Sequence, residues 1–186
     1  MSETQTSFSP TDNAQRYGSV TRLLHWVMAT LILWQFFCMI LKVIFGKQDF
    51  LKPFVMSHQP VGFILACLIV LRVLWALANL SNRPDHGQGL VASAARIGHV
   101  ALYVLMVAVP GLAILRGWGN DRAFMPFGLP INPGRPEKIE WAVNIGSAHG
   151  LLAWLLLLVV LGHIFMVLVH ERIWRDGTLS RMIGRR

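Results

Sequence analysis

Histidines inside long apolar stretches are the residues of this sequence best suited to chemistry. An ionisable side chain is costly inside a membrane, and its presence there indicates a function by default. Neutral imidazole binds metal ions well, and the haem iron of an electron-transfer protein takes two strong axial ligands of this kind. We therefore treat the histidines within or at the ends of the apolar stretches as candidate haem ligands. They are His25, His58, His99, His149, His163 and His170.

Two of these histidines, His149 and His163, lie 14 residues apart in a single apolar stretch. At 1.5 Å per residue this spacing is roughly 21 Å and nearly four turns, so both side chains share one face of a helix. One helix can therefore carry a ligand for each of two stacked haems. The seventh histidine, His86, follows Asp85 in a polar loop, where we expect it to be solvated. The sequence has no Cys-x-x-Cys-His motif, which excludes covalent c-type attachment.

The elements that must position these histidines are membrane-spanning helices. Apolar types make up 54% of the residues and charged types 14%, more apolar surface than a soluble fold of this size can bury. Each apolar stretch approaches or exceeds the roughly 20 residues that cross about 30 Å of hydrocarbon, and none alternates as a barrel strand would. Short connections favour antiparallel neighbours. We predict an all-α, integral membrane four-helix up-down bundle, with helices at about 22–45, 58–80, 94–116 and 141–172.

The predicted transmembrane domain covers residues 16–176, between a polar segment at 1–15 and a basic tail at 177–186. We expect the first segment to be disordered. Lysine and arginine near helix ends set the orientation of a membrane protein, and the basic tail predicts that both termini are cytoplasmic. The net charge is +8, and its bases flank the apolar stretches rather than forming one dense patch. We therefore expect lipid as a partner and no nucleic acid.

Depth in the membrane predicts which histidines share an iron. Ligands to one iron must project from facing helices at the same level. With both termini inside, His58 begins the second helix at its outer end, and His149 lies near the outer start of the fourth. These two residues are the predicted ligands of an outer haem.

The inner pair is less constrained. His25 lies near the inner end of the first helix, and its partner is His99, His163 or His170. A ligand at His170 would separate the two irons by roughly 32 Å along the helix, more than the hydrocarbon thickness of about 30 Å. His163 keeps both haems within the membrane and closer together for electron transfer, and we prefer it as the partner of His25. His99 and His170 are then interfacial residues or neighbours of a haem propionate or a quinone.

A single intramembrane histidine is often a hydrogen-bonded packing residue, and this is the alternative for each of them. Two histidines on one helix face with partners at matched depths are harder to explain in that way. Arg72 lies about two turns before the inner end of the second helix. Its planar guanidinium suits bidentate binding of a haem propionate, although it could instead extend to the membrane interface.

The predicted outer face is basic. Its charges could steer an anion such as superoxide toward the protein, or they could be ordinary solvated loop charges. They include Lys42, Lys47, Lys52, Arg116 and Arg122.

Several short stretches resemble the prokaryotic cytochrome b561 family of small dihaem membrane cytochromes. The likeness runs from residue 16 nearly to the end, and the order and spacing of the stretches carry it rather than any one motif. The matching stretches are RYG at 16–18, LHW at 24–26, SHQPVG at 57–62, RVLW at 72–75, GHVALY at 98–103, HG at 149–150, GH at 162–163 and WRDGTLSRM at 174–182.

The resemblance implies two non-covalent haem b groups in a bacterial inner-membrane protein. It implies bis-histidine ligation by His25 with His163 and by His58 with His149. It also implies exchange of electrons with the quinone pool, and ubiquinone is the expected substrate. A member of this family oxidises superoxide at the outer face and passes the electron to ubiquinone.

We therefore predict a dihaem b-type cytochrome that transfers electrons across the bilayer to or from the quinone pool. Such a protein is a candidate quinone-linked oxidoreductase, with superoxide or a periplasmic redox protein as candidate partners at the outer face. One alternative is the cytochrome b anchor subunit of a larger membrane dehydrogenase or hydrogenase. Another alternative is a non-haem protein, such as a histidine-lined metal transporter.

Overall fold

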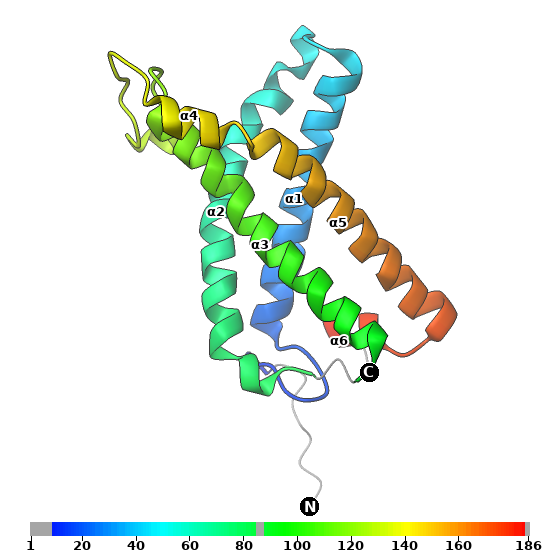
Figure 1. Ribbon diagram of the computed structural model, residues 1–186. Coiled ribbons are helices and arrows are strands. Elements are labelled where there is room, and N and C mark those ends of the chain that lie inside the picture. Colours follow the sequence, from blue (N-terminus) through cyan, green and yellow to red (C-terminus); the bar gives the residue numbers. More distant parts are fainter. Residues whose placement is uncertain (1–8, 85–87, 185–186) are drawn as a thin grey trace, which may run out of the picture.

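The computed structural model of this protein describes residues 9–84 and 88–184, and His86 lies outside the described residues. Within the described part, four helical runs are long and apolar enough to cross a membrane. The predicted all-α four-helix membrane architecture is confirmed (Figure 1). The first three runs hold α1 (Ser19–Phe45), α2 (Lys52–Ala78) and α3 (Leu90–Gly119).

The fourth run, Glu140–Trp174, is built from three consecutive pieces. They are the short α4 (Glu140–Gly146), the long α5 (His149–Val169) and one π-helical turn, η4 (His170–Trp174). Short helical turns also lie in the connections, and a final helix closes the described chain. These are η1 (Asp49–Leu51), η2 (Leu80–Asn82), η3 (Pro126–Gly128) and α6 (Thr178–Ile183).

All four spans begin earlier than the predicted ranges, and α2 and α3 differ from them the most. α2 starts at Lys52 with Pro53 in its first turn, a position where the missing backbone N–H costs nothing. α3 starts at Leu90, directly after Gly89, whose φ of 97° suits glycine. These early starts lengthen the polar ends of the helices beyond the apolar stretches and leave the histidines inside the spans.

Helices that follow one another in the chain pack against each other. α1 packs on α2, α2 on α3, and α3 on both α4 and α5. A small apolar core between α3 and α5 contains Leu105, Val109 and Leu156. The histidine-bearing faces of α1 and α2 meet α5 at their side chains, as described below.

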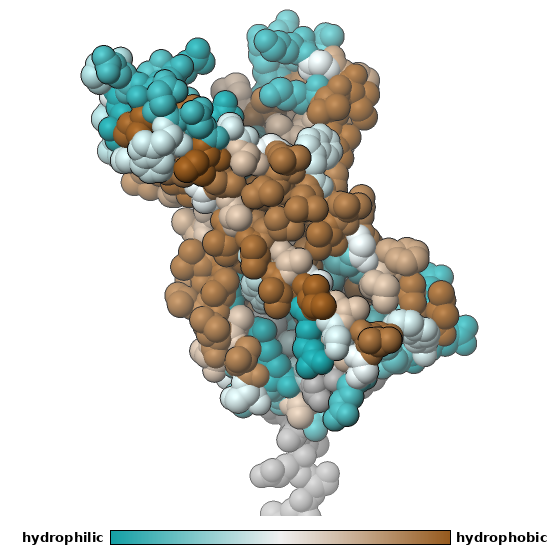
Figure 2. Space-filling view, viewed as in Figure 1, coloured by the Kyte–Doolittle hydropathy of each residue, from teal (hydrophilic) through white to brown (hydrophobic). Residues whose placement is uncertain are grey.

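Large apolar side chains cover the outside of the helices. On α5 alone, Leu151 is 74% exposed and Leu158 is 66% exposed. Figure 2 shows this apolar surface over the middle of the helices, with hydrophilic side chains gathered at the ends. An apolar surface of this kind is suited to contact with the hydrocarbon core of a bilayer. The chain is a multi-pass membrane protein.

The two ends of the bundle differ in what they carry. One end holds the connections 46–51 and 120–139, and we call it the loop end. The other holds residues 9–18, the described parts of the α2–α3 connection (79–84 and 88–89) and α6 (Figure 1), and we call it the terminal end. The described parts of both terminal segments therefore lie on the same side of the protein.

The terminal end is held together by a buried carboxylate. Asp12 lies in the segment that we expected to be disordered, yet its side chain is fully buried. It accepts hydrogen bonds from the Thr21 hydroxyl at 2.6 Å and the Gly18 amide at 2.8 Å, and it pairs with Arg83 at 3.4 Å. The Trp75 indole donates to Thr21 at 2.9 Å. Asp12 thus joins the start of the chain to α1, α2 and the α2–α3 connection.

The predicted basic tail also folds back on the bundle. In α6, the Arg181 carbonyl accepts from the Tyr17 amide at 3.4 Å, and the Met182 carbonyl accepts from the Trp26 indole at 3.4 Å. Burial is the main cause that raises the pKa of the Tyr17 phenol. The tail is therefore a packed element of the terminal end.

Candidate functional site

The loop-end pair of histidines comes from α2 and α5. The ring centroids of His58 and His149 are 6.1 Å apart, and the ring planes are inclined by 84°. An iron bound to two facing imidazole nitrogens at roughly 2 Å each places the ring centres roughly 6 Å apart. The spacing of this pair therefore suits two axial ligands of one iron.

Hydrogen bonding at His149 favours the form of imidazole that binds metal. Its Nδ1 lies 2.8 Å from the backbone carbonyl oxygen of Val109 on α3. A carbonyl can only accept, so Nδ1 carries the proton and the lone pair of Nε2 is left for a metal. The Nδ1 atom of His58 is buried and has no hydrogen-bond partner among the described residues. The donor set of this pair fits haem iron.

The terminal-end pair has nearly the same spacing. His25 of α1 and His163 of α5 have ring centroids 6.4 Å apart, with an interplanar angle of 66°. His99 of α3 also faces His163, at a centroid distance of 5.6 Å. Three imidazoles therefore meet at this level, and His163 is common to both contacts. Sequence reasoning left the role of His99 open, and the structure places this residue beside His163.

Arg72 of α2 joins the terminal-end group. Its Nη2 lies 3.4 Å from Nδ1 of His25, and its guanidinium carbon lies 5.8 Å from the Tyr103 ring centroid. Its Nη1 is buried and has no hydrogen-bond partner among the described residues. A buried guanidinium with a free donor is suited to receiving an anionic group.

His170 lies apart from both pairs. Its Nδ1 is 2.5 Å from a carboxylate oxygen of Asp176, and its ring packs against Trp174 at 4.6 Å between centroids. The slight burial of Asp176 acts to raise its pKa, but hydrogen bonds from Thr178 and His170 outweigh this effect and lower the pKa to about 2. His170 therefore ties the π-turn to the tail.

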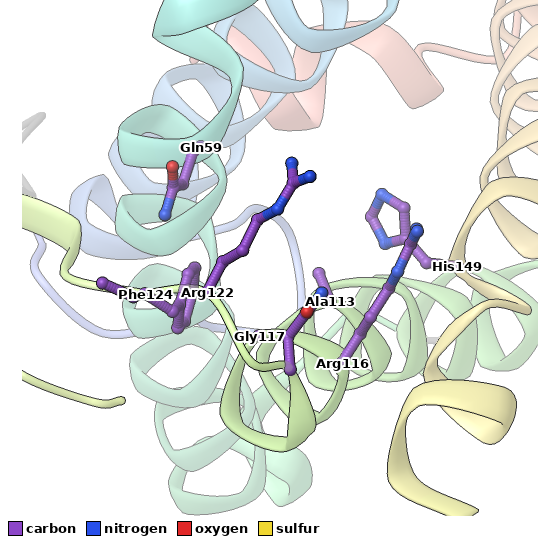
Figure 3. A pocket seen from close by; sticks show the side chains of 9 residues that line it. Gln59, Ala113, Arg116, Gly117, Arg122, Phe124 and His149 are labelled. Atoms are coloured by element: carbon purple, nitrogen blue, oxygen red, sulfur yellow. The ribbon is translucent and has the colours of Figure 1, made fainter. Parts of the chain in front are cut away.

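A cavity of about 390 Å³ opens beside the loop-end pair. Figure 3 shows its side chains converging from α2, α3, the α3–α4 connection and α5. The Arg116 and Arg122 side chains have no ion pair or hydrogen bond within the described chain. The lining is Gln59, Ala113, Arg116, Gly117, Asn120, Arg122, Ala123, Phe124 and His149.

Sequence reasoning missed two features of this region. Gln59 directly follows the predicted ligand His58, and this adjacency in the sequence could have identified it as a site residue. Asn132 is 1% exposed and holds the connection that bears Arg122. Its position in a Gly- and Pro-rich loop gave no indication of burial, because the partners of its side chain are backbone carbonyls brought together by the fold.

Comparison with known proteins finds one protein family and several relatives that this chain resembles. A family model described as prokaryotic cytochrome b561 matches residues 16–185. "Cytochrome b561 homolog 2" of Escherichia coli K12 is 28% identical over 178 residues, covering 94% of this chain and 95% of that protein. "Probable superoxide oxidase CybB" of Yersinia pestis is 24% identical, covering 92% and 98%. "Probable Ni/Fe-hydrogenase 1 B-type cytochrome subunit" of E. coli K12 is 24% identical, covering 68% and 67%.

Proposed function

The chain belongs to the prokaryotic cytochrome b561 family of electron-transfer membrane proteins, and on that premise we propose that it is a dihaem b-type cytochrome. It carries electrons across the bilayer to or from the quinone pool. The observation that carries the proposal is the two pairs of facing imidazoles that α5 joins through His149 and His163, at 6.1 Å and 6.4 Å between ring centroids. The family implies haem b, and these two histidine pairs would hold two haem groups.

In this proposal His58 and His149 hold the loop-end haem, and His25 and His163 hold the terminal-end haem. Each haem, when bound, supplies one-electron redox chemistry. The protein positions the ligands: the Val109 carbonyl keeps the proton of His149 on Nδ1, and α5 fixes the separation of the two sites. Apolar side chains between the sites, such as Leu105 and Leu156, exclude water from the interior.

Arg72 is proposed to bind a propionate of the terminal-end haem. An arginine can only donate, so its contact with His25 requires Nδ1 of that ring to accept. Ligation of iron through Nε2 puts the proton on Nδ1, which can then no longer accept. The guanidinium is left with free donors, including the buried Nη1, and a carboxylate would satisfy them.

The proposed location is the bacterial inner membrane, with the terminal end cytoplasmic and the loop end periplasmic. The proposal rests on the basic tail and on the shared side of both terminal segments. Within it, residues 1–15 and 177–186 form the cytoplasmic ends of a cytochrome domain at 16–176, with lipid as its surroundings.

Ubiquinone is the proposed membrane reactant, and superoxide is a candidate electron donor at the loop end. The name of the Yersinia relative supports the second suggestion. The name of the hydrogenase-associated relative supports another function, a cytochrome b subunit that anchors a larger redox enzyme. That relative matches over only about two thirds of each chain, so we favour the independent cytochrome.

The haem proposal is tested by changing one ligand in the purified full-length protein. His149→Ala is expected to lower the haem content from two per chain to one, measured by pyridine haemochrome assay and reduced-minus-oxidised spectra. His170→Ala is the matched control and should retain both haems, since its ring is engaged by Asp176. Two haems in the His149→Ala protein, or no b-type absorption in the unmodified protein, would overturn the proposal.

The electron donor and acceptor are tested by stopped-flow reduction of the haems with superoxide and with quinol. Reduction by superoxide followed by reoxidation with ubiquinone supports an independent oxidoreductase. Exchange that depends on a co-purifying soluble redox subunit supports the anchor function instead.

A further inference from the structure

The loop-end cavity carries a more specific assignment. We propose that Arg116 and Arg122, assisted by Gln59, bind the two propionates of the loop-end haem and keep its reduction potential high. This inference rests on the proposed haem between His58 and His149. In the sequence, Arg116 and Arg122 were identified only as part of a basic outer face.

The three polar groups reach the cavity from different elements. Gln59 follows His58 on α2, Arg116 lies in the last turns of α3, and Arg122 comes from the α3–α4 connection. In Figure 3 the guanidinium of Arg122 extends into the space between Gln59 and His149, and Arg116 runs alongside the His149 ring. His149 itself lines the cavity, so these polar groups lie beside the site that would hold the loop-end haem.

The cavity is lined by two cations and by no carboxylate. The acidic neighbour of Arg122 in sequence, Asp121, lies 4.0 Å from Lys138 instead. Another arginine of the same loop, Arg135, is already engaged, donating to the Trp118 carbonyl at 3.1 Å and stacking on its ring at 4.8 Å. Arg116 and Arg122 have no such partners within the described chain. They are therefore available for an external anion.

The loop is braced so that Arg122 stays at the rim. The Asn132 side-chain amide donates to the carbonyls of Asn120 at 2.7 Å, Gly117 at 3.1 Å and Arg122 at 3.2 Å. Phe124 exchanges backbone hydrogen bonds with Asn132 at 2.7 Å and 3.1 Å. A side chain at Gly117 would meet the Phe124 ring at 2.6 Å, so glycine permits this close approach. Fixed backbone on both sides reduces the entropy lost when the guanidinium binds.

The charge of the cavity suits the carboxylate-bearing edge of a porphyrin, since its lining has two cations and no carboxylate. A haem edge carries two carboxylates, and the cavity offers two guanidinium groups. Arginine and carboxylate pair bidentately, which fixes orientation as well as charge.

The pairing of guanidinium groups with propionates predicts the direction in which the reduction potential of the loop-end haem shifts. Cations beside the iron disfavour its more positively charged ferric state. They also neutralise propionates, whose negative charge would otherwise stabilise the ferric state. Removing the two guanidinium groups should therefore make the loop-end haem easier to oxidise, that is, lower its reduction potential.

The experiment is redox titration of the purified holoprotein carrying Arg116→Gln, Arg122→Gln or both. We expect two haems per chain in each variant. In the double variant, the ferric-to-ferrous equilibrium of the loop-end haem should shift at least tenfold toward ferric, which is 59 mV for a one-electron couple. The haem absent from His149→Ala identifies which couple is which. Lys47→Gln removes an exposed loop-end charge that does not line the cavity, and it should leave both couples near their original potentials.

Two further readouts separate propionate binding from a diffuse charge effect. Loss of the guanidinium partners raises the propionate pKa, so the potential of the loop-end haem in the double variant should acquire a dependence on pH that the unmodified protein lacks. If the cavity instead binds a free anion, the unmodified protein's potential will depend on added phosphate.

Phosphate dependence of that kind, an equal shift of both haems, or no shift in the double variant overturns this inference while leaving two haems per chain. A single haem or none in the unmodified protein defeats the underlying haem proposal instead. The two failures are therefore distinguishable.

Discussion

At the scale of single residues, His163 is the most informative position because two imidazoles face it. His25 lies 6.4 Å away and His99 lies 5.6 Å away between ring centroids. Depth along the helices predicted that these residues would lie at the same level of the membrane, because a helix rises 1.5 Å per residue. It could not predict which ring faces which, because that depends on helix rotation and packing.

Replacement of each candidate partner of His163 should give opposite results. His25→Ala is expected to remove the terminal-end haem, whereas His99→Ala should retain two haems with a modestly altered spectrum. Haem content and low-temperature difference spectra of both variants measure this. Loss of a haem from His99→Ala with two haems in His25→Ala would exchange their roles.

Arg72 should tune the terminal-end haem without holding its iron. We expect Arg72→Gln to retain two haems and to lower the potential of the terminal-end couple, by tens of millivolts, about the scale of a several-fold change in the equilibrium. Arg72→Lys should recover part of the shift, because it restores charge without the bidentate geometry. An unchanged potential in Arg72→Gln would argue that the guanidinium only packs on Tyr103.

At the scale of elements, the spans were predictable and the connections were not. Apolar length alone locates helices that must satisfy their own backbone in lipid. The α3–α4 connection instead depends on Asn132, whose buried amide bonds to carbonyls up to 15 residues away in sequence. No local pattern encodes those contacts. The two arginines of the cavity were therefore recognisable from the sequence only as part of a basic outer face.

Asn132→Ala should loosen this connection. Buried carbonyls that lose their donor cost about 1–3 kcal/mol, so we expect a lower melting temperature for the loop-end haem environment, followed by Soret absorbance. Asn144→Ala, an exposed change on the neighbouring α4, is the control and should melt like the unmodified protein. Equal melting of both variants would show that the brace is dispensable.

At the scale of the whole molecule, the described parts of both terminal segments are packed onto one end of the bundle. The polarity of residues 1–15 led us to expect a disordered segment. The fold instead buries the Asp12 carboxylate among a hydroxyl, an amide and a guanidinium from three regions. A buried charge is stable only with such partners, and sequence proximity reveals none of them apart from the nearby glycine and threonine.

Asp12→Ala should therefore destabilise the terminal end more than a surface change does. Removing the buried carboxylate leaves the Thr21 hydroxyl and the Gly18 amide without their acceptor, and we expect a loss of about 1–3 kcal/mol. Asp49→Ala removes an exposed pair with Lys52 at the loop end and should change stability by less than about 1 kcal/mol. Denaturation of the two variants in detergent provides the comparison, and similar losses would contradict a structural role for Asp12.

The uninterrupted stretch of α5 between His149 and His163 has an electrical consequence. In the proposed arrangement, an electron passing from one haem to the other travels roughly 21 Å along this helix, about two thirds of a hydrocarbon core about 30 Å thick. A full crossing is worth about 2.3 kcal/mol for every 100 mV of transmembrane voltage, so this step would be electrogenic. The energised state of the cell would then shift the distribution of electrons between the two haems, and the same protein would conduct differently in a polarised membrane than in detergent.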